Sequence, residues 1–270
     1  MKIEKKFPGK RAVVTGAASG LGLAICERLA AEGWKLLIVD INASRLAEAE
    51  TRLQALGAQT LSLVMNVTQH EALEDAAQIL QKNWGGVDLV FNNAGIATAG
   101  TIEELTEEDW RKTIDVDLWS VIYGCRTFSA LLKKQGSGHI INTASSAGTL
   151  APPEMAAYNV AKAGVISLSE TLKVELWRHN IGVTVVCPTV FGTSLGDSIT
   201  DSTRAMELSL LKQLEESKVT PHHIAEDVIT AIERNRLYVM SQADAKWGWR
   251  FKRFFPETYA SLLAYLYRSK

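Results

Sequence analysis

The 270-residue sequence predicts an α/β fold, with a doubly wound parallel sheet of about seven strands and helices on both faces. Short, β-branched runs that are apolar on both faces alternate along the chain with stretches of helical periodicity. No internal repeat, low-complexity tract or Pro/Gly-rich linker interrupts this alternation. We therefore expect one domain over residues 1–270.

Seven runs have the composition of buried strands. They are Ala12–Thr15, Lys35–Asp40, Thr60–Met65, Leu89–Asn92, His139–Thr143, Gly182–Cys187 and Leu237–Met240. Helices are expected to begin near Gly20, Ala43, Gln69, Thr106, Glu154 and His222. Two segments lie outside the alternation, a substrate loop near 188–215 and an aromatic, basic tail over 243–270. Long loops in a compact domain often serve as lids or binding loops.

Composition excludes several classes of partner. The net charge of -1 provides no field that favours nucleic acid. The three cysteines lie in apolar runs without metal-ligand spacing, so we expect reduced thiols, no metal site and a cytoplasmic protein. No apolar signal region follows the charged first residues, and no run of about 18 apolar residues predicts a membrane span.

A glycine-rich segment, GAASGLG, follows the first predicted strand. Its glycines permit a tight turn, close approach of the backbone to a phosphate, and close packing of helix on strand. The helix that follows presents free N–H groups to an anion. The GxxxGxG spacing alone is also compatible with an ordinary turn. The predicted cofactor contacts here are Gly16, Ser19, Gly20, Leu21 and Gly22.

The second strand ends in an acidic residue, Asp40, 18 residues after Gly22. A carboxylate at this position can accept hydrogen bonds from the adenosine ribose and repels a 2′-phosphate. The next residue is Ile41, and the glycine segment contains no Arg or Lys. These features favour NAD over NADP and add Asp40 and Ile41 to the cofactor contacts. The alternative is that Asp40 only caps the helix over 42–56.

Three polar side chains are expected to converge beyond the carboxyl ends of the strands. Tyr158 and Lys162 are four residues apart and share one helix face. Ser145 follows the strand over 139–143 and precedes Tyr158 by 13 residues. A nearby ammonium lowers the tyrosine pKa from about 10, which favours a phenolate base. Ser145 would hold the substrate oxygen, Tyr158 would exchange the alcohol proton, and Lys162 could also hold the cofactor ribose.

Four segments in register, TGAASGLG, NNAG, the serine of TASS, and YNVAK, resemble the short-chain dehydrogenase/reductase family of NAD type over roughly residues 8–240. The resemblance implies a Rossmann-type fold and a homodimer or homotetramer. It also implies an oxidoreductase that transfers a hydride between NAD and a secondary alcohol or ketone. The cofactor-binding residues implied by the family are Asn66, Val67, Asn92, Asn93, Ala94, Gly95, Tyr158, Lys162, Pro188, Val190 and Thr193.

Two positions depart from the family pattern. Asp117 stands where the family often has an asparagine whose backbone carbonyl connects through a water to the lysine. An aspartate could make the same backbone contact, but a buried carboxylate would raise the Tyr158 pKa and oppose the phenolate. We keep Asp117 with Ser145, Tyr158 and Lys162 as a catalytic candidate. The second departure is Pro188-Thr189 in place of the usual Pro-Gly.

The substrate loop indicates an apolar small molecule. It contains no fixed cationic cluster, and its apolar residues could face a ligand or form the core of a small helix. These residues are Leu195, Ile199, Met206, Leu210 and Leu211. The alternative function is a catalytically weak NAD(H)-binding regulator or scaffold, which the intact Ser145, Tyr158 and Lys162 argue against. A third hypothesis, an NADP-dependent enzyme, is opposed by Asp40.

The tail contains six Lys/Arg residues and one acidic residue between positions 246 and 270. It could anchor the protein at a membrane surface, contact another subunit or cover the substrate pocket. The preferred interpretation is a terminal helix docked on this fold or on its partner. Membrane association is the minority interpretation.

Overall fold

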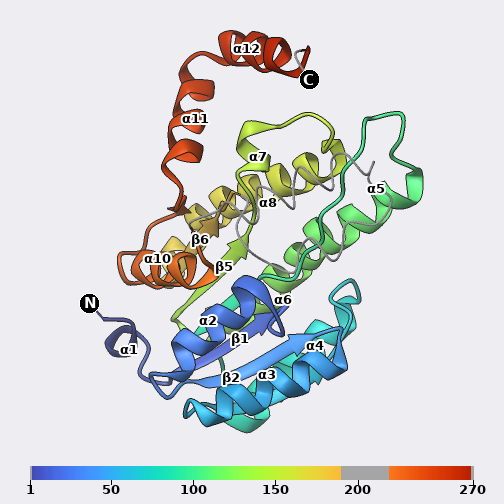
Figure 1. Ribbon diagram of the computed structural model, residues 1–270. Helices are drawn as coiled ribbons and strands as arrows, with labels where there is room; N and C mark the ends of the chain where they lie inside the picture. The colour runs from blue at the N-terminus through green and yellow to red at the C-terminus, as the bar shows by residue number, and fades with distance from the viewer. Residues whose placement is uncertain (1, 190–218, 269–270) are drawn as a thin grey trace.

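The computed structural model describes residues 2–189 and 219–268 (Figure 1). Its centre is a parallel seven-stranded sheet with the order β3-β2-β1-β4-β5-β6-β7. The strands are β1 Arg11–Thr15, β2 Lys35–Asp40, β3 Gln59–Val64, β4 Leu89–Asn92, β5 Gly138–Thr143, β6 Ile181–Val186 and β7 Tyr238–Val239. The predicted doubly wound α/β sheet is confirmed, and the strand order reverses between β1 and β4.

Helices cover both faces of the sheet (Figure 1). The helices of one face are α1 Ile3–Lys6, α2 Gly20–Ala30, α3 Ala43–Ala55 and α10 Pro221–Glu233. The helices of the other face are α4 His70–Trp84, α6 Ser120–Gln135 and α8 Ala156–Glu175. The remaining helical segments are α5 Glu107–Ile114, a π-helical turn at Asp115–Trp119, α7 Ala147–Leu150, a 3-10 turn at Trp177–His179, α11 Ala243–Phe254 and α12 Pro256–Arg268.

The strands form where β-branched and apolar residues can be buried from both sides. Alternate residues of β1 divide between the two layers, since Val14 packs under α2 and α10 while Val13 packs under the opposite helices. The expectation that all strands are apolar on both faces is wrong for β3. Gln59, Ser62 and Val64 are exposed because β3 is an edge strand with a single neighbour.

Helix starts follow local capping chemistry. Thr106 and Asp109 form a reciprocal capping box at the start of α5. The helix predicted from this point does not continue regularly into α6. It passes through the π-helical turn, in which the Ser120 N–H donates to the carbonyl of Asp115, five residues earlier. The helical periodicity of the sequence did not predict this interruption.

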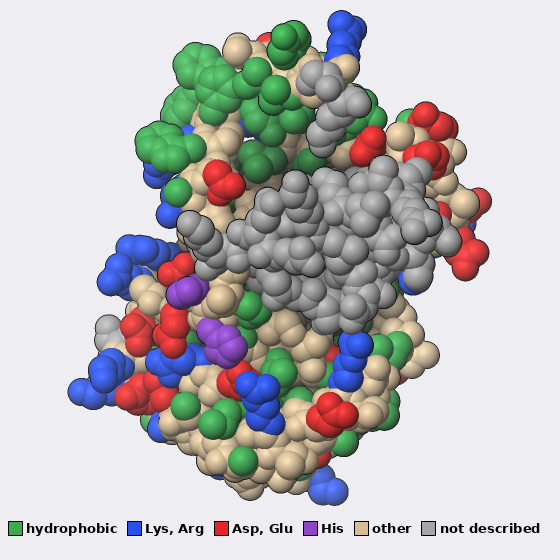
Figure 2. Space-filling model, viewed as in Figure 1, with side chains coloured by type: hydrophobic (Ala, Val, Ile, Leu, Met, Phe, Trp, Pro, Cys, Tyr) green, Lys and Arg blue, Asp and Glu red, His purple; other side chains and the backbone are tan. Residues whose placement is uncertain are grey.

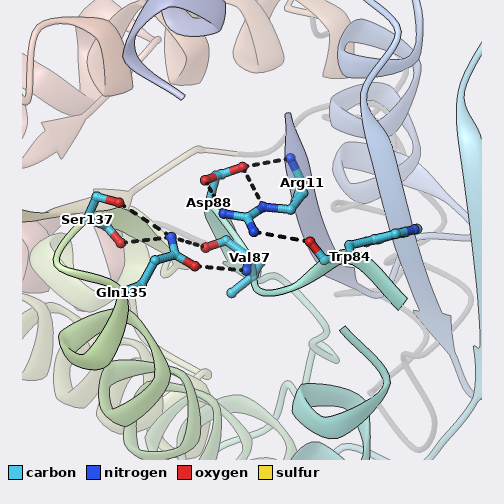
Figure 3. Close-up of polar contacts among 6 residues, drawn as sticks. All are labelled: Arg11, Trp84, Val87, Asp88, Gln135 and Ser137. Atoms are coloured by element: carbon cyan, nitrogen blue, oxygen red, sulfur yellow. Dashed lines mark hydrogen bonds and ion pairs between the residues drawn. The ribbon is translucent and has the colours of Figure 1, made fainter. Parts of the chain in front are cut away.

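A polar network joins the strands at their amino-terminal ends, away from the carboxyl ends where ligands bind (Figure 3). The Arg11 backbone N–H and Nε donate to Asp88 Oδ2 at 3.0 Å, and its Nη2 donates to Asp88 Oδ1 at 2.9 Å. Gln135 Nε2 donates to the carbonyls of Val87 at 2.9 Å and Ser137 at 3.2 Å. The network therefore connects β1, the start of β4 and the approach to β5.

The tail forms two helices that stand out from the sheet and its layers (Figure 1). The preferred expectation of one docked terminal helix is therefore only partly correct. α11 packs beside α7, and the α12 side chain Tyr259 donates its hydroxyl to the carbonyl of Leu150 at 2.9 Å. Nevertheless, no residue of α12 is fully buried.

Candidate active site

The helix α8 presents Tyr158 and Lys162 toward the carboxyl ends of β4 and β5. Their spacing of one helical turn places both on the buried face of α8. Lys162 Nζ lies 5.5 Å from the centroid of the Tyr158 ring. The predicted pairing of this phenol with a cation is therefore present, and both side chains are buried.

Two further groups hold the Lys162 ammonium in place. It donates to the carbonyl of Thr143, the last residue of β5, at 3.3 Å. It also forms an ion pair with Asp117 Oδ1 at 3.4 Å. The same carboxylate oxygen accepts the backbone N–H of Ile96 at 2.9 Å. Lys162 is thus positioned by a strand end and by the π-helical turn.

Asp117 acts here through its side chain, whereas the family pattern implied a backbone contact. The carboxyl is fully buried, and burial raises its pKa, although Lys162 and the Ile96 N–H act in the opposite direction. Within residues 2–189 and 219–268 its Oδ2 atom has no hydrogen-bond partner. A Cβ at Gly95 would lie 2.8 Å from Asp117 Oδ1, so a residue with a side chain there would crowd the ion pair.

Ser145 lies in the turn between β5 and α7. Its Oγ accepts the backbone N–H of Ala147 at 3.1 Å and donates to the carbonyl of Pro188 at 3.4 Å. The Ser145 hydroxyl also acts on the Tyr158 phenol, where its hydrogen bonding favours the ionised form. The structure therefore brings Ser145, Tyr158, Lys162 and Asp117 together.

The pKa of Tyr158 differs from the expectation based on its lysine neighbour. Burial raises this pKa above its ordinary value, and the Asp117 charge raises it further. Lys162 and Ser145 lower it, but burial is the largest influence. The expected directions for Lys162 and Asp117 are therefore both present, and the Tyr158 pKa is raised because desolvation of the phenolate, which the residue spacing did not predict, outweighs the nearby ammonium.

The glycine segment forms a tight backbone cradle at the start of α2. Gly16 has a φ of +64°, and a Cβ there would lie 2.9 Å from the Cα of Ala94. A Cβ at Gly22 would lie 2.0 Å from the carbonyl oxygen of Gly16. Ser19 is the N-cap of α2, and Leu21 is buried beneath the turn. This cradle and the helix N-terminus fit the pyrophosphate of a dinucleotide.

Asp40 supports the cradle from the end of β2. Its Oδ2 accepts the backbone N–H of Ala18 at 3.1 Å, and its Oδ1 accepts the N–H of Asn42 at 3.0 Å. The helix α3 is capped by Asn42, whose side chain accepts the Arg45 N–H at 3.0 Å. The alternative in which Asp40 serves only as the cap of this helix is therefore wrong. Ile41, beside it, is exposed.

The NNAG segment joins the glycine cradle to the central strands. Asn93 Nδ2 donates to the carbonyl of Thr15 at 3.0 Å, and its Oδ1 accepts the hydroxyl of Thr143 at 3.1 Å. The Asn92 side chain instead turns into the protein and donates to Asn142 at 2.8 Å. The Asn92 side chain is thus engaged within the sheet, while Ala94 and Gly95 are partly exposed beside the cradle.

The remaining predicted cofactor contacts lie after the carboxyl ends of β3 and β6. Asn66 is exposed after β3, and its Oδ1 accepts the N–H of Thr68 at 3.0 Å, next to the buried Val67. Pro188 follows β6 and contacts Ser145 and Ser146 through its carbonyl. Val190 and Thr193 lie outside the described residues, as does most of the predicted substrate loop.

Sequence reasoning missed two threonines of the site. The Thr15 hydroxyl accepts the backbone N–H groups of Asn93 at 2.9 Å and Ala94 at 3.0 Å. Thr143 supplies a carbonyl to Lys162 and a hydroxyl to Asn93. Both are the last residues of their strands. A polar residue at the carboxyl end of a central strand was the available signal.

The chain is similar in sequence to known dehydrogenases. The family model described as short chain dehydrogenase matches residues 10–204. A CLA biosynthesis dehydrogenase/reductase of Lactiplantibacillus plantarum is 31% identical over 260 residues, with 89% of this chain and 90% of the relative covered. A D-threitol dehydrogenase of Mycolicibacterium smegmatis is 32% identical over 206 residues, with 76% and 79% covered.

A solved structure is similar over nearly the whole chain. A short-chain dehydrogenase/reductase from Burkholderia phymatum, in complex with NAD, superposes with a TM-score of 0.87 at 30% identity. The match covers 92% of this chain and 94% of the other. The chain belongs to the short-chain dehydrogenase/reductase family and is an oxidoreductase with a Rossmann-type fold.

Proposed function

We propose that this protein transfers a hydride between NAD and the carbon of an apolar secondary alcohol or ketone, with Tyr158 as the acid/base. The observation that carries the proposal is the convergence of Tyr158, Lys162 and Ser145 beside the glycine cradle. The relative named D-threitol dehydrogenase supports the alcohol/ketone class. The regulator or scaffold alternative is disfavoured because none of the three side chains is replaced.

The residues have distinct roles in this mechanism. A bound nicotinamide cofactor supplies the acceptor or donor of the hydride. Ser145 holds the substrate oxygen with its hydroxyl and stabilises the charge that develops there. Tyr158 takes the alcohol proton during oxidation and returns it during reduction. Lys162, whose Nζ lies 5.5 Å from the centroid of the Tyr158 ring, stabilises the phenolate, and Asp117 and the Thr143 carbonyl hold Lys162 in place.

The choice of NAD rests on Asp40. Its carboxylate lies at the end of β2 beside the glycine cradle, where it already accepts the Ala18 N–H. A 2′-phosphate close to it would meet a negative charge, whereas ribose hydroxyls can donate to it. NADP dependence is the competing hypothesis.

We also propose that residues 1–270 act as one catalytic domain in a cytoplasmic homodimer or homotetramer. The cysteines Cys26, Cys125 and Cys187 are buried and free, which supports a reducing compartment. No helix of the described chain is long and apolar enough to cross a bilayer.

The experiment is NADH formation from NAD with secondary alcohols of increasing apolar size, with Tyr158→Phe as the matched variant. We expect turnover with the larger apolar alcohols and a loss of about 10²–10⁴-fold in the variant. NADH binding should be retained, because the substitution leaves the glycine cradle intact. Near-normal turnover by the variant would refute the acid/base assignment, and turnover with NADP alone would refute the cofactor choice.

A further inference from the structure

The helices α11 and α12 carry a cluster of exposed apolar side chains, which we call the tail surface. Its members are Trp247, Phe251, Phe254, Phe255, Leu262 and Tyr265. Trp247 is 68% exposed, and Phe254 and Tyr265 are each 73% exposed. Figure 2 shows apolar side chains gathered over these helices, with Lys and Arg at their margin. Apolar clusters of this kind on a protein surface mark sites of interaction.

Helical spacing brings the members of the tail surface together. Phe251 and Phe254 follow Trp247 by four and seven residues, which places them on one stripe of α11, and Phe255 is the C-cap residue that ends this helix. Phe251 also contacts Phe255, with ring centroids 5.7 Å apart. Leu262 and Tyr265 continue the apolar side chains onto α12, beyond Pro256.

The helix α12 contacts the body of the protein through two tyrosine hydroxyls. Tyr259 donates its hydroxyl to the carbonyl of Leu150 at 2.9 Å, and Tyr267 donates to Glu154 Oε1 at 2.8 Å. These contacts fix α12 through hydroxyl groups. The larger apolar side chains of the helix are left in solvent, so the fold itself does not account for them.

The tail has a charge opposite to that of the rest of the chain. Residues 243–270 contain six Lys/Arg and two acidic residues, a net charge of +4. The whole chain has a net charge of -1, which leaves -5 on residues 1–242. The positive charge is therefore concentrated where the exposed aromatic side chains lie.

The cations are interleaved with the aromatic rings. The Arg250 guanidinium lies 5.3 Å from the centroid of Trp247, and that of Arg253 lies 5.7 Å from Trp249. Aromatic rings combined with Lys and Arg suit the headgroup region of a bilayer. Two copies of this surface that faced each other would each bring a net charge of +4, and like charges across an interface are unfavourable, which disfavours a second copy of this surface as the occupant.

We propose that the tail surface docks on an anionic lipid bilayer. The aromatic side chains enter the headgroup region, and the surrounding Lys and Arg residues attract anionic headgroups. The protein lies on the bilayer without crossing it. This binding does not depend on the oxidoreductase activity and is measured separately.

The test is flotation of the full chain with vesicles of phosphatidylcholine, with and without phosphatidylglycerol. We expect binding that requires phosphatidylglycerol and weakens at high salt. The double variant Trp247→Ser/Phe254→Ser should lose at least about tenfold in affinity. Lys246→Gln/Arg250→Gln should also weaken binding, because both cations lie beside the tail surface. NADH binding by each variant verifies that the fold is intact.

Trp177→Ser is the matched control. Trp177 is 67% exposed, against 68% for Trp247, but it lies in the 3-10 turn after α8 and outside the tail surface. This variant should bind vesicles as the unmodified protein does. Equal loss in both tryptophan variants, or the absence of vesicle binding by the unmodified protein, would overturn the proposal. A tail variant that dissociates an oligomer while vesicle binding is unchanged would identify a second copy as the occupant and likewise overturn it.

Discussion

The two ends of the sheet use buried charge in different ways. At the amino-terminal end, Arg11 and Asp88 form an ion pair at 2.9 Å with additional hydrogen bonds to the same carboxylate. At the carboxyl end, Lys162 and Asp117 are 3.4 Å apart, and Asp117 Oδ2 has no hydrogen-bond partner within the described ranges. The Asp88 carboxylate uses both of its oxygens to bind Arg11, whereas the Asp117 carboxylate has one oxygen that could accept a further hydrogen bond.

This difference indicates which charges stabilise the fold and which prepare the site. A buried polar group without a partner costs free energy, so such a group persists where it serves another purpose. Asp117 and Lys162 lie beside the acid/base candidate, whereas Arg11 and Asp88 lie at the opposite strand ends. Substitutions at the carboxyl end should therefore affect turnover as well as stability, whereas substitutions at the amino-terminal end should affect stability alone.

The largest expected effect is that of Lys162→Met. Removing the ammonium takes away the cation that favours the Tyr158 phenolate, so turnover should fall by about 10²–10⁴-fold. The loss also leaves the Asp117 carboxylate buried without its cation, which should cost about 3 kcal/mol in the free energy of unfolding. Steady-state kinetics and urea unfolding measure the two effects.

The double variant Lys162→Met/Asp117→Asn separates these effects. It removes the unpaired carboxylate, so most of the lost stability should return while turnover stays low. If turnover returned together with stability, Lys162 would act mainly as a structural partner of Asp117.

The next largest effect is expected at the other end, with Asp88→Ala. The Arg11 guanidinium would lose its buried partner, and the free energy of unfolding should fall by about 3 kcal/mol. Turnover per folded molecule should remain unchanged, because the site lies at the opposite strand ends. Urea unfolding at fixed protein concentration, combined with active-site titration, provides the measurement. A loss of turnover in folded protein would contradict the division between the two ends.

A smaller effect is expected for Asp40→Asn, which removes a charge from the carboxyl end and keeps a hydrogen-bond acceptor. Alanine at this position would also remove the acceptor for the Ala18 N–H and disturb the cradle. The asparagine variant should lower the ratio of NADH affinity to NADPH affinity by about tenfold, because NADPH no longer meets a negative charge. Fluorescence titration with both cofactors measures the ratio. An unchanged ratio would remove Asp40 from the ribose site.

The smallest effect is a change of pH dependence in Asp117→Asn. The Asp117 charge raises the pKa of Tyr158, so its removal should lower that pKa. Alcohol oxidation requires the phenolate and increases as pH rises through the pKa. The rising limb of the kcat profile should therefore move to lower pH in the variant. A shift to higher pH would show that Asp117 acts mainly by stabilising the Lys162 ammonium.

Much of the fold was predictable because the strands have a distinctive apolar, β-branched composition. β2 and β4 begin and end where expected, and no boundary of the other strands differs by more than one residue. β3 is more exposed than the central strands because it lies at the sheet edge. Its polar Gln59, Thr60 and Ser62 are a local sign of this exposure, whereas its place in the strand order is a property of the whole sheet.

The candidate site was predictable to the same degree. The spacing of Tyr158 and Lys162 determined their shared helix face before the structure was known. The side-chain contact of Asp117 with Lys162 was not predictable, because it depends on the π-helical turn and on the lack of a side chain at Gly95. The raised pKa of Tyr158 was also missed, since it depends on how completely the phenol is buried.

Because of the π-helical turn, the number of residues in the segment Asp115–Trp119 matters for function. Such a turn accommodates one residue more than a regular helix would hold, and each residue of an α-helix rotates the chain by about 100°. Deleting one residue between 115 and 119 could restore a continuous α-helix from α5 to α6, yet it would turn the carboxylate of Asp117 or the packed face of α6 away from its present partners. A deletion that makes the helix regular would thus prevent Asp117 from reaching Lys162 while α6 keeps its packing on the sheet, or the reverse. This stretch should therefore tolerate substitutions far better than changes in length.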